Sequence, residues 1–361
     1  MPFYVKNIEI FCSMKDIIIA HIHSSSNKGV CTGHYMSLAA LYVNLLSDYC
    51  HVKIAGGPLY ANRFVDEDVI KLPLSIDVKA TSFVCVKKMI TNAKRLFSQT
   101  KGQIVIIQDG KPVANHICIL LCYKRCDLFL IKYHTDGVNK LWKKILFFLI
   151  KNRIKGIICP SDAIGQAHGL PYCVVPDYIY TGDSHNNWKN FDERYYDFGC
   201  IGRIEPEKGI IDVVKKFKGT QYKLLIAGNP SSMELETEIK EICDDAPNIE
   251  LRLGYLSDKD YNSALNNIKY AILNYQGVYA KRSSGVVYDM LFHGIPVVGS
   301  NCGSLNFVRE NQVGFIYNSL SDFDPNEVMS KLQHTKYLKK IEDYCDMHKK
   351  YKKKLTTFLG L

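Results

Sequence analysis

One short segment of the sequence places two basic residues where a phosphate group could bind. The run GCIGRIEPEKGI, residues 199–210, predicts a buried strand that ends at Gly202-Arg203 and a helix that begins at residues 207–209. Arg203 can present a planar fork of donors and Lys208 a mobile point charge, a pair suited to a diphosphate without a metal ion. The alternative is an arginine at a strand end and a solvated lysine, with no ligand.

A second segment, KRSSGVVYDMLFHGIPVVGSNCGS at 281–304, offers backbone donors and a carboxylate. Ser283, Ser284 and Gly285 precede a helical run, so their N–H groups would point from a helix N-terminus, a position that favours phosphate oxygens. Asp289 lies one turn further along, where its carboxylate can accept hydrogen bonds from both hydroxyls of a ribose. The alternative for Asp289 is a carboxylate on a helix surface.

These segments resemble those of the retaining glycosyltransferases of family 4, and the likeness extends over most of residues 198–318. That family has a Gly-Arg, Pro-Glu-Lys-Gly segment after its interdomain linker, and later a helix ending in Gly-x-Pro-Val-Val. Both stand here, as GRIEPEKG and GIPVV. The run LLIAGNP at 224–230 is similar to the family's strand and glycine turn, and residues 253–275 to its base-side loop, helix and strand. Four segments in the right order make the resemblance specific.

The resemblance implies an α/β fold of the GT-B architecture, with two facing Rossmann-like doubly wound domains and an interdomain cleft. It implies a retaining glycosyltransferase that moves a sugar from a nucleoside-diphosphate sugar to an acceptor hydroxyl. Neither a metal ion nor another cofactor is expected. The positive charge of the first half of the chain favours a saccharide or lipid-linked saccharide acceptor, in the synthesis of a surface polysaccharide or glycolipid.

By the same resemblance, Arg203 and Lys208 would hold the donor diphosphate and stabilise the negative charge that grows on it as it leaves. Asp289 would take the place of the family's ribose-binding glutamate. The expected donor-binding set is therefore Gly33, Arg203, Lys208, Ser283, Ser284, Gly285, Val286 and Asp289.

One departure from the family concerns the transferred sugar. The family usually carries two glutamates separated by seven residues, and counting back from Asp289 puts Lys281 where the first should stand. That glutamate normally contacts the sugar. Lys281, next to Arg282, could favour a donor sugar with a carboxylate. Alternatively, the loop YQGVYAKRSSG follows a different path.

The first half of the chain offers weaker candidates. Gly33 lies between the expected first strand and first helix, where the family places a glycine loop under the donor phosphates. A helix N-cap at Thr32 is the alternative. His134 follows a strand as the family's cleft histidine does, so we expect it near the transferred sugar as a catalytic group. A lone histidine is more often structural, and His116 is a further, weaker candidate.

Short apolar runs alternate with helical stretches along the whole chain, a pattern typical of parallel sheets covered by helices. We expect an N-terminal acceptor-side domain over residues 1–180 and a polar linker over 181–197. A nucleotide-sugar-binding domain follows over 198–340. Residues 341–361 form a basic tail that could return to the first domain.

Composition excludes several classes of protein. The 361 residues are 47% hydrophobic and 23% charged, as in an ordinary globular protein. The 13 cysteines lie on apolar runs without the paired spacing of a zinc site, so we expect buried, reduced thiols in a cytoplasmic protein. No Asp-x-Asp pair stands at a strand end to bridge a metal to a diphosphate.

The net positive charge lies in the first half, where residues 1–190 carry 23 Lys and Arg against 13 Asp and Glu. No apolar run reaches the roughly 18 residues of a membrane-spanning helix. Residues 139–156, however, combine basic and large apolar residues at helical spacing. They could lie peripherally on an anionic membrane surface, at the inner face of a membrane. A core helix with a solvated basic face is the alternative.

Other functions remain open on the sequence alone. A nucleotide-sugar epimerase of the same architecture would need acid and base carboxylates, of which the sequence offers no clear pair. A catalytically silent relative that binds nucleotide is conceivable because of Lys281. Nucleic acid is an unlikely partner, since basic and aromatic residues do not interleave as in single-strand binding platforms.

Overall fold

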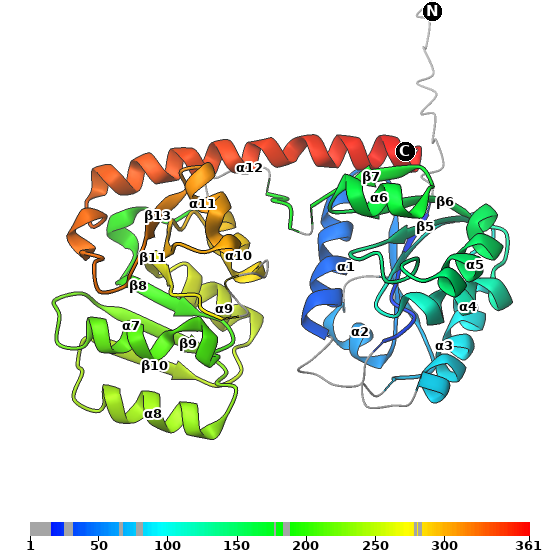
Figure 1. Ribbon diagram of the computed structural model, residues 1–361. Coiled ribbons are helices and arrows are strands. Elements are labelled where there is room, and N and C mark those ends of the chain that lie inside the picture. Colours follow the sequence, from blue (N-terminus) through cyan, green and yellow to red (C-terminus); the bar gives the residue numbers. More distant parts are fainter. Residues whose placement is uncertain are drawn as a thin grey trace, which may run out of the picture. The chain divides into compact units, whose positions relative to one another are not determined.

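The computed structural model describes residues 16–24, 32–64, 68–76, 82–176, 178–182, 188–277, 280 and 284–361. The chain divides into two compact units (Figure 1). Unit 1 comprises Met1–Thr181 and Lys349–Leu361, and unit 2 comprises Gly182–His348. Lys281, Arg282 and Ser283, which the sequence analysis singled out, lie outside the described residues.

Unit 1 is built on a parallel sheet of seven strands in the order β3-β2-β1-β4-β5-β6-β7. Its strands are β1 (Ile17–Ala20), β2 (Val52–Gly56), β3 (Asp68–Lys71), β4 (Ile104–Gln108), β5 (Asp127–Ile131), β6 (Ile154–Cys159) and β7 (Tyr172–Val174). Its helices are α1 (Thr32–Leu46), α2 (Pro58–Arg63), α3 (Ser82–Phe97), α4 (Pro112–Cys122), α5 (Leu141–Ile150) and α6 (Asp162–His168).

The central strands of unit 1 are buried on both faces, which explains their unbroken apolar runs IIIA and IVII. Ile18 packs into a core shared with α3, α4 and α5, and its neighbour Ile19 packs into a core on the opposite face with α1. Leu355 and Leu359, at the end of the C-terminal helix, belong to this second core.

Unit 2 repeats the plan with six parallel strands in the order β10-β9-β8-β11-β12-β13. These strands are β8 (Tyr196–Ile201), β9 (Leu224–Gly228), β10 (Ile249–Leu253), β11 (Ile268–Leu273), β12 (Val297–Ser300) and β13 (Gly314–Tyr317). The helices are α7 (Ile210–Phe217), α8 (Met233–Cys243), α9 (Asp258–Leu265), α10 (Gly285–Phe292) and α11 (Asn306–Glu310). The C-terminal helix α12 (Lys331–Leu359) belongs to unit 2 as far as His348 and to unit 1 from Lys349 onward. Short 3-10 turns include η2 (Phe191–Glu193) and η3 (Pro206–Lys208).

In both sheets the strand order reverses beside the first strand, between β1 and β4 in unit 1 and between β8 and β11 in unit 2. Open parallel sheets bind ligands outside the carboxyl ends of the strands at such switch points. The order confirms the predicted fold class of two Rossmann-like doubly wound α/β domains. The cleft expected between the two domains stays a prediction.

From residue 188 onward, the polar segment at 181–197 is hydrogen-bonded to the rest of unit 2. The Arg194 guanidinium is buried and donates hydrogen bonds to the backbone carbonyls of Ile268 and His293, both at 2.9 Å. Trp188 donates its indole N–H to the Phe292 carbonyl at 2.9 Å. Trp188 and Arg194 therefore anchor this segment to unit 2, although its sequence is polar and rich in turns.

The helices in the described part of the chain include none that is long and apolar enough to cross a membrane. Every cysteine in that part is a free thiol, and most are buried, as the apolar runs predicted.

Candidate functional site

The candidate donor site is built around the carboxyl end of β8, at the switch point of unit 2. Gly202 follows the strand with a φ of +110°, and a side chain there would come within 3.0 Å of Val286 in α10. Gly228 at the end of β9 has a φ of +146°, and a Cβ there would lie 1.7 Å from the Gly202 carbonyl oxygen. Glycine therefore allows the two strand ends to meet backbone to backbone, with α10 against them.

Lys208 lies within η3 and is buried, with 7% of its surface exposed. The sequence analysis expected Lys208 at a helix start, and α7 begins two residues later; it did not expect the lysine to be buried. The helix α7 begins only after Gly209. This glycine has a φ of +61°, and its close approach to Asn274 places η3 next to the end of β11. Burial lowers the pKa of the Lys208 ammonium, while the nearby Glu205 carboxylate raises it and the Arg203 guanidinium lowers it further.

Arg203 is 60% exposed, and its Nε lies 2.7 Å from a carboxylate oxygen of Glu205, which is 17% exposed. Arg203 and Lys208 line the same small pocket at the ends of β8 and β11, together with Tyr275. The structure thus brings the two predicted cations together, and adds a carboxylate that the sequence analysis did not consider.

The helix α10 begins beside this pocket. Its N-cap Ser284 is buried, and the Ser284 hydroxyl shares a hydrogen bond of 2.8 Å with the Tyr275 hydroxyl. Gly285 and Val286 form the first turn, whose N–H groups have no partners within the helix and would suit an anion. The first turn carries no acidic residue.

Asp289 lies in the second turn of α10 and is partly buried. Its Oδ2 accepts a hydrogen bond of 2.9 Å from the hydroxyl of Tyr261 in α9. Burial raises the pKa of the Asp289 carboxyl, and the hydrogen bond from Tyr261 and the nearby His293 partly oppose the shift. Tyr261 was missed from the sequence because 28 residues separate it from Asp289.

A second pocket of unit 2, of about 570 Å³, lies at the carboxyl ends of β11, β12 and β13. Its lining is polar, with Asn274, Ser300, Asn301 and Tyr317 from the strand ends and Lys216 from α7. Its volume falls within the range of small-molecule sites. None of the residues singled out from the sequence lines this pocket.

The first-half candidates lie in unit 1. Gly33 is the second residue of α1, which follows β1 in the chain. His134 is exposed in the loop after β5. That loop is anchored on both sides, because Lys132 before it is buried and the Asp136 carbonyl accepts a hydrogen bond from Lys143 at 2.7 Å.

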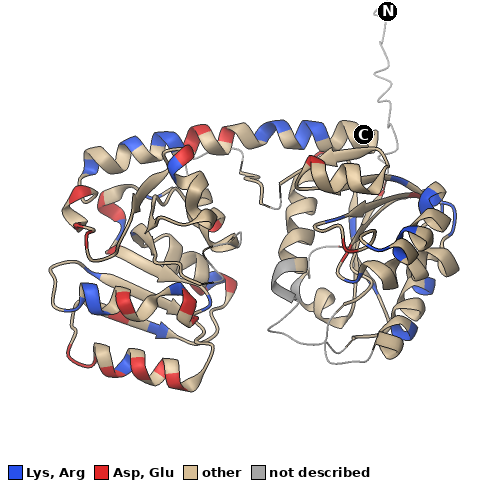
Figure 2. Ribbon diagram, viewed as in Figure 1, with Lys and Arg blue, Asp and Glu red and all other residues tan. Residues whose placement is uncertain are grey.

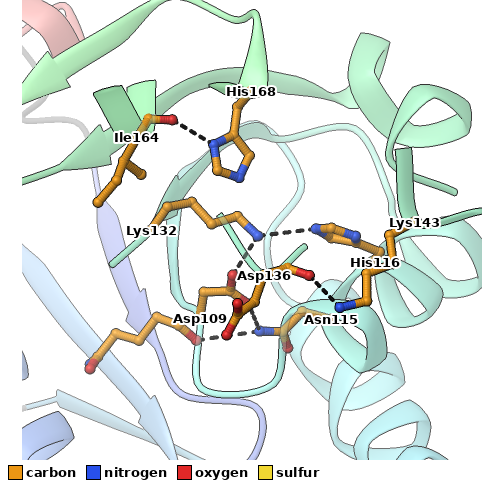
Figure 3. Close-up of polar contacts among 9 residues, drawn as sticks. Asp109, Asn115, His116, Lys132, Asp136, Lys143, Ile164 and His168 are labelled. Atoms are coloured by element: carbon orange, nitrogen blue, oxygen red, sulfur yellow. Dashed lines mark hydrogen bonds and ion pairs between the residues drawn. The ribbon is translucent and has the colours of Figure 1, made fainter. Parts of the chain in front are cut away.

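Lys132 belongs to a buried polar cluster at the ends of β4 and β5 (Figure 3). Its ammonium pairs with the Asp109 carboxylate and lies 3.0 Å from Nε2 of His116. Burial, followed by the charge of Lys132, lowers the pKa of His116 to about 2, so this imidazole is neutral at physiological pH. Asn115 donates to the other Asp109 oxygen at 2.8 Å. His116 is fully buried in this cluster and contacts Lys132.

Among the described residues, no three His, Cys, Asp or Glu side chains are grouped so that they could hold a metal ion.

Comparisons with known proteins identify the class. Residues 196–334 match the family model described as "Glycosyl transferases group 1". A comparison with curated protein sequences gives no match. The chain is similar in structure to Alr3699/HepE from Anabaena in complex with UDP-glucose, with 14% identity, a TM-score of 0.60, and 96% of this chain and 99% of that chain covered.

It is also similar to the apo form of the lipopolysaccharide outer core galactosyltransferase WaaB, with 14% identity, a TM-score of 0.57 and coverage of 95% and 99%. AviGT4, a glycosyltransferase involved in avilamycin A biosynthesis, gives 16% identity, a TM-score of 0.57 and coverage of 96% and 98%. The chain therefore has the GT-B fold. It is a glycosyltransferase with a group 1 domain in unit 2.

Proposed function

We propose that the chain transfers a sugar from a nucleoside-diphosphate sugar to an acceptor hydroxyl, with the α-linkage of the donor retained. The observation that carries the proposal is the meeting of Arg203, Lys208 and the first turn of α10 at the switch point of unit 2. Two cations and a set of backbone donors are what a leaving diphosphate needs as its charge grows. Asp289, one turn further along α10, is proposed as the carboxylate that binds the ribose.

The names of the structural neighbours guide the choice of donor. Alr3699/HepE has been crystallised with UDP-glucose and with UDP, and WaaB is named as a galactosyltransferase. We therefore propose a uridine diphosphate hexose as the first donor to test, and a saccharide or lipid-linked saccharide in surface polysaccharide or glycolipid synthesis as the acceptor. His134 is proposed as the catalytic group near the transferred sugar, from the family resemblance.

A thermal-shift screen of nucleoside diphosphates and their sugars tests the donor site directly. A ligand at 100 times its dissociation constant should stabilise the fold by about 2.7 kcal/mol. Hydrolysis and transfer assays with the stabilising donor, with and without saccharide acceptors, then test the reaction. Binding without hydrolysis or transfer would favour a silent nucleotide-binding relative, and a new sugar epimer without transfer would favour an epimerase.

We propose further that the enzyme needs no metal ion, because Arg203 and Lys208 can neutralise the diphosphate themselves. Activity should therefore survive excess EDTA. The control is a metal-dependent glycosyltransferase assayed with the same donor, which must lose activity in the same buffer. Loss of transfer on chelation, with recovery on adding Mg²⁺ or Mn²⁺, would contradict the proposal.

An anionic membrane surface is the proposed partner of unit 1, and the cytoplasmic face of a membrane the proposed location. The support is α5, which exposes five large apolar side chains and carries no acidic residue. Basic residues lie on this helix and on the turns around it (Figure 2). Apolar side chains that insert into a bilayer, with cations beside them, are typical of interfacial helices. The five are Leu141, Trp142, Ile145, Phe148 and Leu149.

A further inference from the structure

Glu205 is the charged residue of the donor site that the proposed reaction does not use. It stands two residues after Arg203 in an extended backbone and caps η3, where its carbonyl accepts a hydrogen bond from the Lys208 N–H at 3.0 Å. Its side chain turns back along the chain, so that one carboxylate oxygen lies 2.7 Å from Arg203 Nε. With 17% exposure, this carboxylate is largely removed from water.

The site therefore holds two cations and one anion close together. Without the anion, the Arg203 guanidinium and the buried Lys208 ammonium would repel each other, and the lysine would lose its proton more readily. The Glu205 carboxylate opposes both effects. A diphosphate that binds the same two cations brings at least two negative charges close to Glu205, and like charges at such distances repel.

We infer that Glu205 is a resident counter-ion of the diphosphate site: it pairs with Arg203 in the free enzyme and competes with the diphosphate for that guanidinium. This inference rests on the proposed function. It predicts that Glu205 weakens the binding of the nucleoside diphosphate product, and so favours its release.

The chain offers a matched control for this charge. Glu207 lies in the same segment and carries the same charge, but its side chain is exposed to solvent. Glu205→Gln and Glu207→Gln each remove one negative charge, and the two positions lie two residues apart. Glu205→Ala removes in addition the group that could accept a hydrogen bond from Arg203.

The experiment measures the affinity of wild type and the three variants for inorganic pyrophosphate and for UDP by titration calorimetry at physiological ionic strength. Glu205→Gln and Glu205→Ala should both bind pyrophosphate about tenfold more tightly, because a like charge is removed from beside the anion. Glu207→Gln should stay within about twofold of wild type, since exposed charges are well screened. In the transfer assay, the inhibition constant of the nucleoside diphosphate product should fall in parallel.

Unchanged affinity for pyrophosphate in both Glu205 variants would overturn the inference. So would wild-type affinity in Glu205→Gln with weaker binding in Glu205→Ala, because that pattern means that Glu205 only orients Arg203. If wild type binds pyrophosphate but no nucleoside diphosphate, and both Glu205 variants bind pyrophosphate more tightly, the counter-ion inference stands and the proposed donor site fails.

Discussion

Replacing Lys208 by methionine is expected to weaken nucleoside diphosphate binding by ten- to a hundredfold while leaving the fold at least as stable as before. A charge-assisted hydrogen bond to a phosphate contributes about 1.5–3 kcal/mol, which sets the expected loss. Stability should not fall, because the burial that lowers the pKa of Lys208 also disfavours its charged form, and an apolar side chain of similar length removes that cost. Titration calorimetry and thermal unfolding measure the two quantities separately.

The pH dependence of wild type gives a second readout for Lys208. Its pKa is lower in the folded chain than in the unfolded chain, so between these two values the unfolded state binds more protons and stability from this group rises with pH. Donor affinity should fall over the same window, because the anion needs the charged lysine. Lys208→Met should lose both trends.

The matched control is Lys240→Met, an exposed lysine on α8 that lines neither pocket of unit 2. It should bind nucleoside diphosphate as wild type does. Arg203→Ala should weaken binding ten- to a hundredfold as well, again without unfolding the protein, because Arg203 is largely exposed. If Lys208→Met and Arg203→Ala both keep wild-type affinity, the diphosphate does not bind at the end of β8.

The fold could be predicted from the sequence because the residue patterns that indicate its strands and helices are local. Runs such as IIIA in β1 and IVII in β4 are apolar throughout, as strands buried on both faces must be. The segment between β2 and α3 has a less regular residue pattern, because Pro58 and Pro73 interrupt it, and it forms the short α2 and β3. Cys118 and Cys122, two of the cysteines that were expected to be buried thiols on apolar runs, lie in α4 and are buried.

Side-chain partnerships were harder to predict, since they depend on how strand ends meet. Lys132 and His134 both follow β5 as polar residues, but only Lys132 turns inward, to Asp109 at the end of β4. The pairing of Arg203 with Glu205 is local, yet it depends on an extended backbone at Glu205 that the pattern of residue types does not specify. In the sequence, this pairing is indicated only by an arginine and a glutamate that stand two residues apart at a strand end.

The hydrogen bonds around α5 decide which of its basic residues can be replaced to test the membrane proposal. The basic residues of α5 are not equivalent: Lys143 donates hydrogen bonds to the Asp136 carbonyl at 2.7 Å and to Asn139 at 2.9 Å, so replacing it would disturb the loop that carries His134. Lys140 and Lys144 are exposed. They can be reversed in charge without breaking these bonds.

Leu141 and Phe148 are the most exposed apolar residues of α5, at 75% and 74%, and lie seven residues apart, on one face of the helix. Burying a large apolar side chain contributes about 1.5–3 kcal/mol. We therefore expect Leu141→Ser with Phe148→Ser to reduce binding to anionic vesicles by about a hundredfold or more. Lys140→Glu with Lys144→Glu should also reduce it, because each basic residue near an anionic surface contributes about 1 kcal/mol.

Co-sedimentation with vesicles, with and without an anionic lipid and at low and high salt, measures this binding. The controls are Phe83→Ser and Lys87→Glu on α3, which alter an exposed aromatic and an exposed cation of the same unit. Wild type and both controls should bind anionic vesicles, and high salt should weaken that binding because it screens the lysines.

Transfer to a short soluble acceptor should be unchanged in all variants, since none of these residues belongs to the proposed donor site. If both α5 double variants sediment with anionic vesicles as wild type does, α5 is not a membrane-binding surface, and the excess positive charge of the first half must serve the acceptor or solubility instead.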